Sequence, residues 1–292
     1  MTATTSEAAA IRRLARRSHL PRWRAIGIHA MLLTYTFVAL GPVLLVIANS
    51  MKSSTAIFDS PFSPPKPGTF DLVGFRTVFE QAHFDVYFRN SLIVTVTSVF
   101  AVLLLSAMAA HALAEYRFRG NTLVALYFAI GIMIPIRLGT VSLLKLMSNL
   151  GLVNSLLSLI LVYTAMGIPL GVFLLTQFMR QVPRDLKAAA RIDGASEFRV
   201  FGLTLPLVRH GLAAVAVFTM LPVWNDLWFP LILAPGDSTK TVTLGAQQFL
   251  GQFASDWNAV LAALTLAMVP VLLLYILFSR QFLRGLTAGA LK

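Results

Sequence analysis

Long stretches without a charged side chain dominate this sequence. Residues Ile26–Ala48, Ser91–Leu113 and Ala259–Ser279 contain no Asp, Glu, Lys or Arg. A helix of about 20 mostly apolar residues is long enough to cross the hydrocarbon core of a bilayer. Charged residues make up only 12% of the chain, whereas soluble proteins average about 25%. The sequence therefore predicts a polytopic membrane protein and excludes both a disordered chain and a cytosolic globular enzyme.

Three further stretches are apolar enough to cross a membrane. Residues 154–176 carry no charge, residues 123–144 contain the single charge of Arg137, and residues 211–233 contain that of Asp226. We therefore expect an all-α fold with six transmembrane helices, at about 26–48, 91–113, 123–144, 154–176, 211–233 and 259–279.

Glycine and proline predict irregularities in two of these helices. Gly131, Pro135 and Gly139 indicate that the third helix is bent or broken, and such a helix would suit a gate. Gly167 and Pro169 are expected to bend the fourth helix.

Lysine and arginine are distributed unequally between the two sides of these helices. One side carries Arg12, Arg13, Arg16, Arg17, Arg22, Arg24, Arg117, Arg119, Arg180, Arg184, Lys187, Arg191, Arg199, Arg209, Arg280, Arg284 and Lys292, and the other carries Lys52, Lys66, Arg76, Arg89, Lys145 and Lys240. Because basic loops stay in the cytoplasm, we expect both termini to be cytoplasmic. Counting the acids by side places the whole net charge of +12 there. The charge therefore marks orientation, and we expect no nucleic acid partner.

A basic arm, residues 1–25, precedes the first apolar stretch. Its pairs Arg12-Arg13 and Arg16-Arg17 are similar to those of a twin-arginine signal. The apolar run that follows is longer than a signal-peptide core, so we expect an uncleaved first helix. The arm itself is expected to lie against anionic membrane lipid.

The longest outer loop, residues 51–90, begins with a proline cluster and is expected to contain a short amphipathic helix over Phe75–Ala82. Such a loop can dock a partner or simply pack on the helices, and the sequence leaves both alternatives open.

The loop at residues 179–206 combines a helix start, small residues and a turn signal. Pro183 suits the start of a helix, and Asp185 in the first turn interacts favourably with the helix dipole. The strong helix formers Ala188, Ala189 and Ala190 follow, then the turn pair Asp193-Gly194. A second short helix is expected from about Ser196 until Pro206 ends it. An ordinary surface helix is one interpretation. The small-residue face and tight turn favour a docking element for another protein.

In these residues the chain resembles a permease subunit of an ATP-binding cassette (ABC) importer. Such subunits carry a cytoplasmic motif E-A-A-x-x-D-G-A followed by L-P, and the matching residues are Ala189, Ala190, Asp193, Gly194, Ala195, Leu205 and Pro206. The carbohydrate-uptake branch is further matched by Asn49-Ser50-Met51-Lys52, Asn90-Ser91, Gly151-Leu152-Val153-Asn154, Ile168-Pro169-Leu170, Trp224-Asn225-Asp226-Leu227-Trp228 and Gly285-Leu286-Thr287-Ala288-Gly289. The resemblance covers nearly the whole chain.

The chain departs from this pattern at one polar position. Ala188 stands where the motif has Glu, which places one expected polar contact with the ATPase in doubt. Asp185 or Glu197 is a candidate substitute acid.

The resemblance implies a type I ABC importer permease fold in the bacterial cytoplasmic (inner) membrane. It further implies three kinds of partner: a second homologous permease, two cytoplasmic ATPase subunits that dock on the 179–206 loop, and an extracytoplasmic solute-binding protein. ATP and Mg would bind the ATPase subunits, and this chain would bind no cofactor. The function implied is import of a carbohydrate by alternating access, with no catalysis by this chain.

Two charged residues inside the expected helices are candidates for the substrate path. An ionised group costs at least about 2.5 kcal/mol in mid-membrane, so Asp226 is expected to face the protein interior or a water-filled path. Its neighbours Trp224, Asn225 and Trp228 supply aromatic faces and an amide, which suit a sugar. The alternative is a structural hydrogen-bond network with the tryptophans at the interface. Arg137 can pair with Asp226, extend to the interface or line the path.

No enzymatic constellation is present in the sequence. It has no cysteine, its five histidines are scattered without metal-ligand spacing, and it has no P-loop glycine pattern. An ion-gradient-driven secondary transporter of a small polar solute is the alternative function, but that class favours more intramembrane ionisable residues and repeated spans. A structural membrane scaffold would leave the docking element unexplained.

Overall fold

The structure is a computed structural model that describes residues 22–80, 83–250 and 256–290. The basic arm predicted at residues 1–25 lies almost entirely outside them. The helices are α2 (Arg22–Ser50), α3 (Ser54–Asp59), α4 (Val73–Glu80), α5 (Phe84–Glu115), α6 (Asn121–Met133), the 3₁₀ turn η1 (Ile136–Gly139), α7 (Thr140–Asn149), α8 (Leu156–Arg180), α9 (Arg184–Ile192), α10 (Glu197–Leu207), α11 (Arg209–Asn225), α12 (Trp228–Leu233), α13 (Val242–Gln247) and α14 (Trp257–Ala290). The predicted all-α fold is confirmed.

Three of these helices are long and apolar enough to cross a membrane: Trp23–Ser50, Phe84–Glu115 and Leu156–Arg180. The pairs α6 with η1–α7 and α10 with α11 would bring the number to five if each bent pair is one span. A shorter apolar helix, Trp257–Leu273, belongs to α14. The six-span count stays a prediction, as does the cytoplasmic placement of the termini.

The break predicted in the third apolar stretch is present. α6 ends at Met133, and the axis turns by 81° into η1 and α7. Pro135 lies between the two parts with φ −76° and ψ 83°. Since proline has no N–H to donate and its ring clashes with the preceding turn, it ends the helix there.

The fifth apolar stretch is not one helix, which corrects the expectation for residues 211–233. α11 ends at Asn225, Asp226 is extended with ψ 133°, and the short helix α12 begins at Trp228. The carboxylate of Asp226 accepts hydrogen bonds from the backbone N–H groups of Trp228 (3.3 Å) and Phe229 (3.1 Å). It therefore caps the start of α12 instead of continuing α11.

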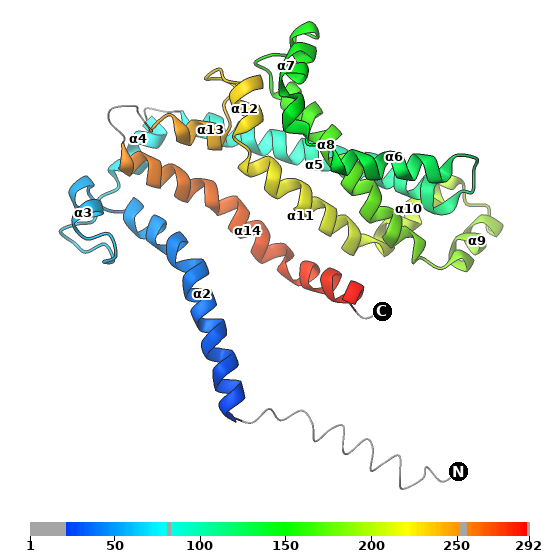
Figure 1. Ribbon diagram of the computed structural model, residues 1–292, viewed down its shortest axis with the longest axis horizontal. Helices are drawn as coiled ribbons and strands as arrows, with labels where there is room; N and C mark the ends of the chain where they lie inside the picture. Colours follow the sequence, from blue (N-terminus) through cyan, green and yellow to red (C-terminus); the bar gives the residue numbers. More distant parts are fainter. Residues whose placement is uncertain (1–21, 81–82, 251–255, 291–292) are drawn as a thin grey trace.

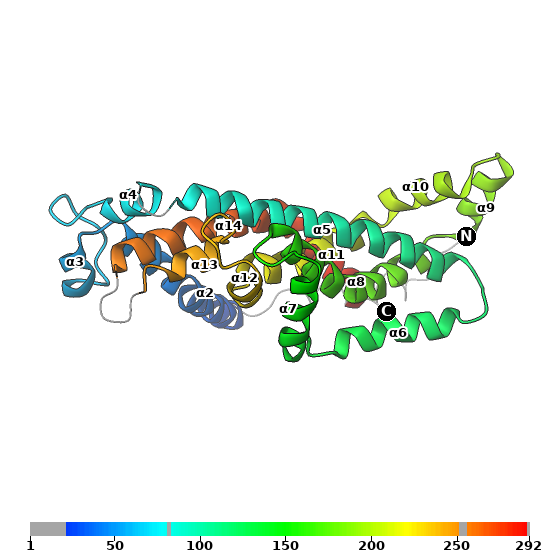
Figure 2. The ribbon, with the colours of Figure 1, turned by 90° about the horizontal axis from the view of Figure 1, so that it is seen from above.

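The core of the molecule lies between α5, α8, α11 and α14, which run along its longest axis (Figure 1). α5 and α8 form the most extensive helix pair in the described part of the chain, and they lie side by side in both views (Figures 1 and 2). α8 is continuous through Gly167 and Pro169. A Cβ at Gly171 would lie 2.3 Å from Ser106 Oγ, so this helix pair depends on the missing side chain.

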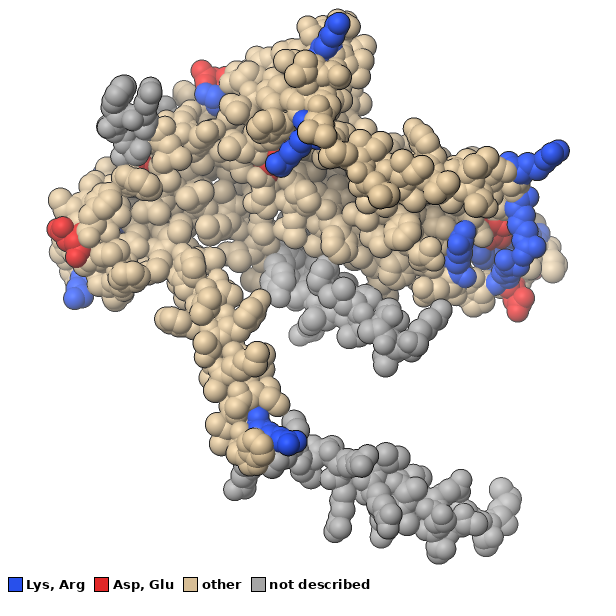
Figure 3. All heavy atoms as spheres, viewed as in Figure 1, with Lys and Arg blue, Asp and Glu red and all other residues tan. Residues whose placement is uncertain are grey.

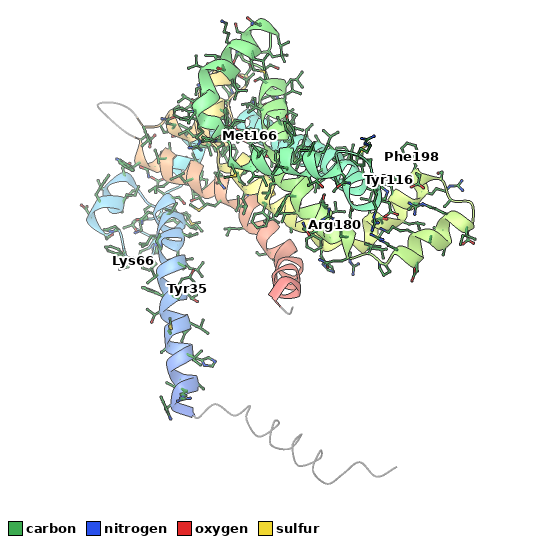
Figure 4. The ribbon with its side chains drawn as sticks, turned by 45° about the vertical axis from the view of Figure 1, so that its right-hand side comes forward. Tyr35, Lys66, Tyr116, Met166, Arg180 and Phe198 are labelled. Carbon is green, nitrogen blue, oxygen red and sulfur yellow. The ribbon has the colours of Figure 1, made fainter. Side chains whose placement is uncertain are left out.

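α2 extends away from this core, and Tyr35 lies on its projecting part (Figure 4). None of its apolar window is buried, and Phe37, Met31 and Tyr35 are each more than 70% exposed. A helix with apolar side chains exposed all round is suited to lipid or to a partner subunit.

Residues 51–80 form a cap over the first turn of α14. The fully buried Lys52 donates from Nζ to Asn49 Oδ1 (2.9 Å) and to the Ser60 carbonyl (2.8 Å), and its burial lowers its pKa. Asn258 Nδ2 donates to the Lys52 carbonyl (2.6 Å), and its Oδ1 accepts from Ser54 (2.5 Å). The short helix predicted at Phe75–Ala82 is α4, Val73–Glu80.

Replacing Asn258 by alanine is expected to loosen the cap. The substitution leaves the Lys52 carbonyl and the Ser54 hydroxyl without their partners, at a cost of about 1–3 kcal/mol. Limited proteolysis of the detergent-solubilised protein should therefore cleave residues 51–80 roughly fivefold faster than in the wild type. Asn149→Ala, at an exposed position of α7, is the matched control. Equal cleavage of N258A and N149A would contradict the prediction.

Candidate functional site

A cavity of about 420 Å³ lies between α8 and α11, near the middle of the molecule where Met166 is labelled in Figure 4. It is lined by Arg137, Tyr163, Met166, Gly167, Leu170, Phe218, Thr219, Pro222, Val223, Asn225, Asp226 and Phe229. The lining combines aromatic rings with a guanidinium, a carboxylate, an amide and two hydroxyl groups. Such a mixture can hold a polar organic solute by hydrogen bonds and ring contacts.

Asp226 joins the elements around this cavity. Its side chain is 8% exposed, and besides capping α12 it accepts a hydrogen bond from the Tyr163 hydroxyl of α8 (2.8 Å). Its backbone carbonyl accepts from Thr243 (2.6 Å) at the start of α13. The carboxylate is thus part of a hydrogen-bond network and also lines the cavity, and its place in a substrate path stays a prediction.

Arg137 extends from η1 toward the same carboxylate. Its Nη2 lies 3.5 Å from Asp226 Oδ1, and 69% of its side chain remains exposed. An exposed pair at this distance is weak. Arg137 therefore pairs with Asp226 and lines the cavity, and its role in a substrate path stays a prediction.

Two tryptophans proposed for the substrate path do not line the cavity. Trp224 is 4% exposed, packs edge-on against Phe88 and donates from Nε1 to the Ala267 carbonyl of α14 (3.0 Å). Trp228 donates from Nε1 to Thr140 Oγ1 at the start of α7 (3.0 Å). The indole N–H of Trp224 therefore joins α11 to α14, and that of Trp228 joins α12 to α7. Asn225, Asp226 and Arg137 do line it.

Tyr163 is the site residue that sequence reasoning missed. It lies within an apolar stretch and is 4% exposed, so nothing in its neighbourhood distinguishes it from a core aromatic residue. Only its contact with Asp226, 63 positions away, identifies it.

The predicted helix, turn and helix of the 179–206 loop are present as α9 and α10. Asp185 lies in the first turn of α9, and Ala188 and Ala189 are exposed on it. Gly194 adopts φ +80°, its N–H donates to the Arg191 carbonyl (3.0 Å), and the Ala195 N–H donates to the Ala190 carbonyl (2.9 Å). These bonds form a Schellman motif, with Asp193 as the C-cap, and it needs the left-handed conformation that glycine adopts without strain.

The end of the molecule formed by α9 and α10 is basic, whereas the broad middle of the surface carries few charges (Figure 3). Large apolar side chains are also exposed there: Ile192 is 86% and Phe198 84% exposed. Tyr116, Arg180 and Phe198 lie at this same end (Figure 4). An exposed apolar tip with a basic surround is suited to contact with another protein.

Glu197, one candidate to replace the motif Glu, forms hydrogen bonds with other residues of this chain. Its carboxylate accepts from Arg191 and from the Tyr116 hydroxyl, and these donors lower its pKa to about 2. Glu197 is therefore ionised at physiological pH, and its interactions with Arg191 would weaken only as pH falls from about 4.5 toward 2.

Long apolar helices, a polar cavity between two of them and an exposed helix–turn–helix at one end define a helical membrane transport component. A family model described as the binding-protein-dependent transport system inner membrane component matches residues 36–287, and the chain belongs to this family.

Characterised relatives cover most of the chain. It is 35% identical over 274 residues to the diacetylchitobiose uptake system permease protein NgcG of Streptomyces coelicolor (93% of this chain, 90% of the relative). It is 33% identical over 259 residues to the arabinooligosaccharides transport system permease protein AraQ of Halalkalibacterium halodurans (88% and 92%).

A solved structure shares the fold. It is the crystal structure of a bacterial ABC transporter involved in the import of the acidic polysaccharide alginate, with a TM-score of 0.77 and 20% identity over 90% of this chain and 99% of that chain. The resemblance to an ABC importer permease is thereby confirmed, and the chain is a multi-pass membrane protein.

Proposed function

We propose that this chain is one of two transmembrane subunits of an ATP-driven carbohydrate importer in a bacterial cytoplasmic membrane. The observation that carries the proposal is that one chain holds both a polar cavity between α8 and α11 and an exposed helix–turn–helix, α9–α10, at one end. The cavity is suited to binding a solute, and the exposed α9–α10 element is suited to binding an ATPase subunit.

The substrate class is supported by the chemistry of the cavity and by the relatives. Tyr163 and Phe218 offer ring faces, and Asn225 and Asp226 offer amide and carboxylate groups for hydroxyls. Relatives named for diacetylchitobiose, arabinooligosaccharides and starch degradation products are similar to this chain over most of its length. An oligosaccharide delivered by an extracytoplasmic binding protein is therefore the proposed cargo.

The partners proposed are a second homologous permease and two cytoplasmic ATPase subunits. The ATPases hold ATP and Mg, and each contacts the α9–α10 element of one permease. Closure of the ATPases moves this element and exposes the cavity to the outside, and hydrolysis resets it. Asp185, Ala188, Ala189 and Gly194 belong to the contact surface in this scheme, in which the chain itself has no catalytic role.

Import by a reconstituted complex tests the proposal. Proteoliposomes with both permeases, the ATPases and the binding protein should accumulate radiolabelled diacetylchitobiose, arabinotriose or maltotriose only when ATP is supplied at the cytoplasmic face. Uptake driven by an ion gradient without ATP would support the secondary transporter instead. ATP-dependent uptake of a non-carbohydrate alone would overturn the substrate class.

Substituting Gly194 by valine is expected to reduce capture of the ATPase subunit roughly tenfold. Holding a non-glycine residue at φ +80° costs about 1–2 kcal/mol, and a branched side chain adds to this cost, so the Schellman turn should open. Capture is measured by pull-down of the co-expressed ATPase with tagged permease. Gly151→Val is the control, because Gly151 also has a positive φ of +66° and open space around it but lies outside the α9–α10 element. Undiminished capture by G194V would contradict the predicted docking role.

A further inference from the structure

Glu115, the last residue of α5, lies against α9. Its Oε2 accepts a hydrogen bond from Lys187 Nζ, and its Oε1 lies 2.9 Å from Arg191 Nη1. The side chains of Glu115 and Lys187 are 11% and 7% exposed. A pair so shielded from water is sensitive to loss of either partner, because the remaining charge is left buried and uncompensated.

Arg191 extends this contact to α10. While Nη1 faces Glu115, its Nε donates to Glu197 Oε1 (2.7 Å) and its Nη2 to Glu197 Oε2 (3.0 Å). The hydroxyl of Tyr116, next to Glu115, donates to Glu197 Oε2 (2.5 Å). We call these five residues, Glu115, Tyr116, Lys187, Arg191 and Glu197, the clasp. The clasp joins the end of α5 to both arms of the α9–α10 element.

The clasp gives this element an attachment that its covalent connections do not provide. Along the chain, α9 follows α8 through residues 181–183, and α10 continues into α11 with a turn of 75°. Neither connection reaches α5. His111 strengthens the contact by packing edge-on against Phe201 of α10, with 5.3 Å between the ring centroids.

α5 in turn leads to the cavity. It is a single helix of 32 residues, which corresponds to about 48 Å. It packs along α8, where the close approach of Gly167 to Val102 leaves no room for an added side chain. α8 supplies Tyr163, Met166 and Gly167 to the cavity wall.

We propose that Glu115 is a positioning residue that transmits movement of the α9–α10 element to α5, and through α5 to the cavity wall. The proposal rests on the proposed function, since it requires an ATPase acting on α9–α10. Glu115 supplies from α5 the carboxylate that pairs with Lys187 and Arg191 of α9.

The absence of cysteine from the sequence provides a direct reporter. Met166→Cys places a unique thiol on the cavity wall, and its alkylation rate is measured in the complete importer with and without ATP and vanadate. In the M166C background, Glu115→Gln should reduce the ATP-dependent change in alkylation rate at least roughly fivefold. The conservative variant Glu115→Asp, which keeps a carboxylate facing both Lys187 and Arg191, should retain most of it. Glu80→Gln, at an exposed position of α4, is the control and should leave the change unaltered.

ATPase capture in the same samples separates the ways in which the response can fail. Normal capture with a lost ATP response in E115Q supports the proposal, as does joint loss of both in E115Q that is absent from E115D. An unchanged ATP response in E115Q overturns it. Joint loss of capture and ATP response in both E115Q and E115D also overturns it, because Glu115 would then serve folding alone. Absence of capture in the M166C parent would instead overturn the proposed function.

Discussion

Substitution of Asp226 by asparagine is expected to lower the transport rate roughly tenfold while the protein still assembles. Asparagine keeps an oxygen that can accept from the N–H groups at the start of α12, so the local fold should persist. It removes the negative charge that faces Arg137 and accepts from Tyr163. Hydrogen bonds to a charged group are worth about 1.5–3 kcal/mol, and tenfold corresponds to about 1.4 kcal/mol. Uptake and membrane yield are measured on the same preparations.

The control for this substitution is Asp237→Asn, which alters an 88% exposed carboxylate paired only with Lys240 in the described contacts. It should transport like the wild type. If D226N loses yield and transport in equal proportion, Asp226 acts only in the structural network and its exposure to the cavity has no part in transport.

Leucine at Gly171 is expected to prevent assembly altogether. A Cβ there would lie 2.3 Å from Ser106 Oγ and 2.8 Å from Ser106 Cβ, before the rest of the leucine side chain is placed. Ser106 is fully buried on α5, so it has no space to withdraw. Overpacking of this kind costs about 1–3 kcal/mol where the surroundings can yield, and more where two long helices must separate. The yield of folded protein from detergent-solubilised membranes should fall at least roughly tenfold.

Gly27→Leu is the matched control, because Gly27 lies on α2 with nothing within 4 Å of the position that a Cβ would take. It adds the same side chain to an apolar helix and should leave the yield within about twofold of the wild type. Normal yield and monodispersity of G171L would show that α5 and α8 do not need their close approach.

The local features of the fold were predictable from local signals. The uncharged stretches 26–48, 91–113 and 259–279 lie inside α2, α5 and α14. Pro135 breaks the third stretch, whereas α8 continues through Pro169. The turn at Gly194 followed from its sequence, because the Schellman bonds join residues no more than five positions apart. In each case the cause and its effect are close in the chain.

The end of α11 was not predictable in this way. Residues 211–233 carry no charge except that of Asp226, and hydropathy does not distinguish one helix from two. The carboxylate that caps α12 meets Tyr163 and Arg137 only in the folded chain. The contact of Trp224 with α14 was equally unpredictable, since its partner Ala267 is 43 positions away.

The sequence by itself determined the membrane class, the helical architecture and the exposed helix–turn–helix, because these depend on composition and on interactions between near neighbours in the chain. Only the tertiary structure decided which polar residues meet. Asp226 meets Tyr163 across 63 positions and Arg137 across 89, and Glu115 meets Lys187 across 72. In an apolar interior a polar side chain must find a partner, but which partner it finds depends on how the helices pack. The cavity and the clasp therefore arise from packing, on helices that the sequence alone was sufficient to specify.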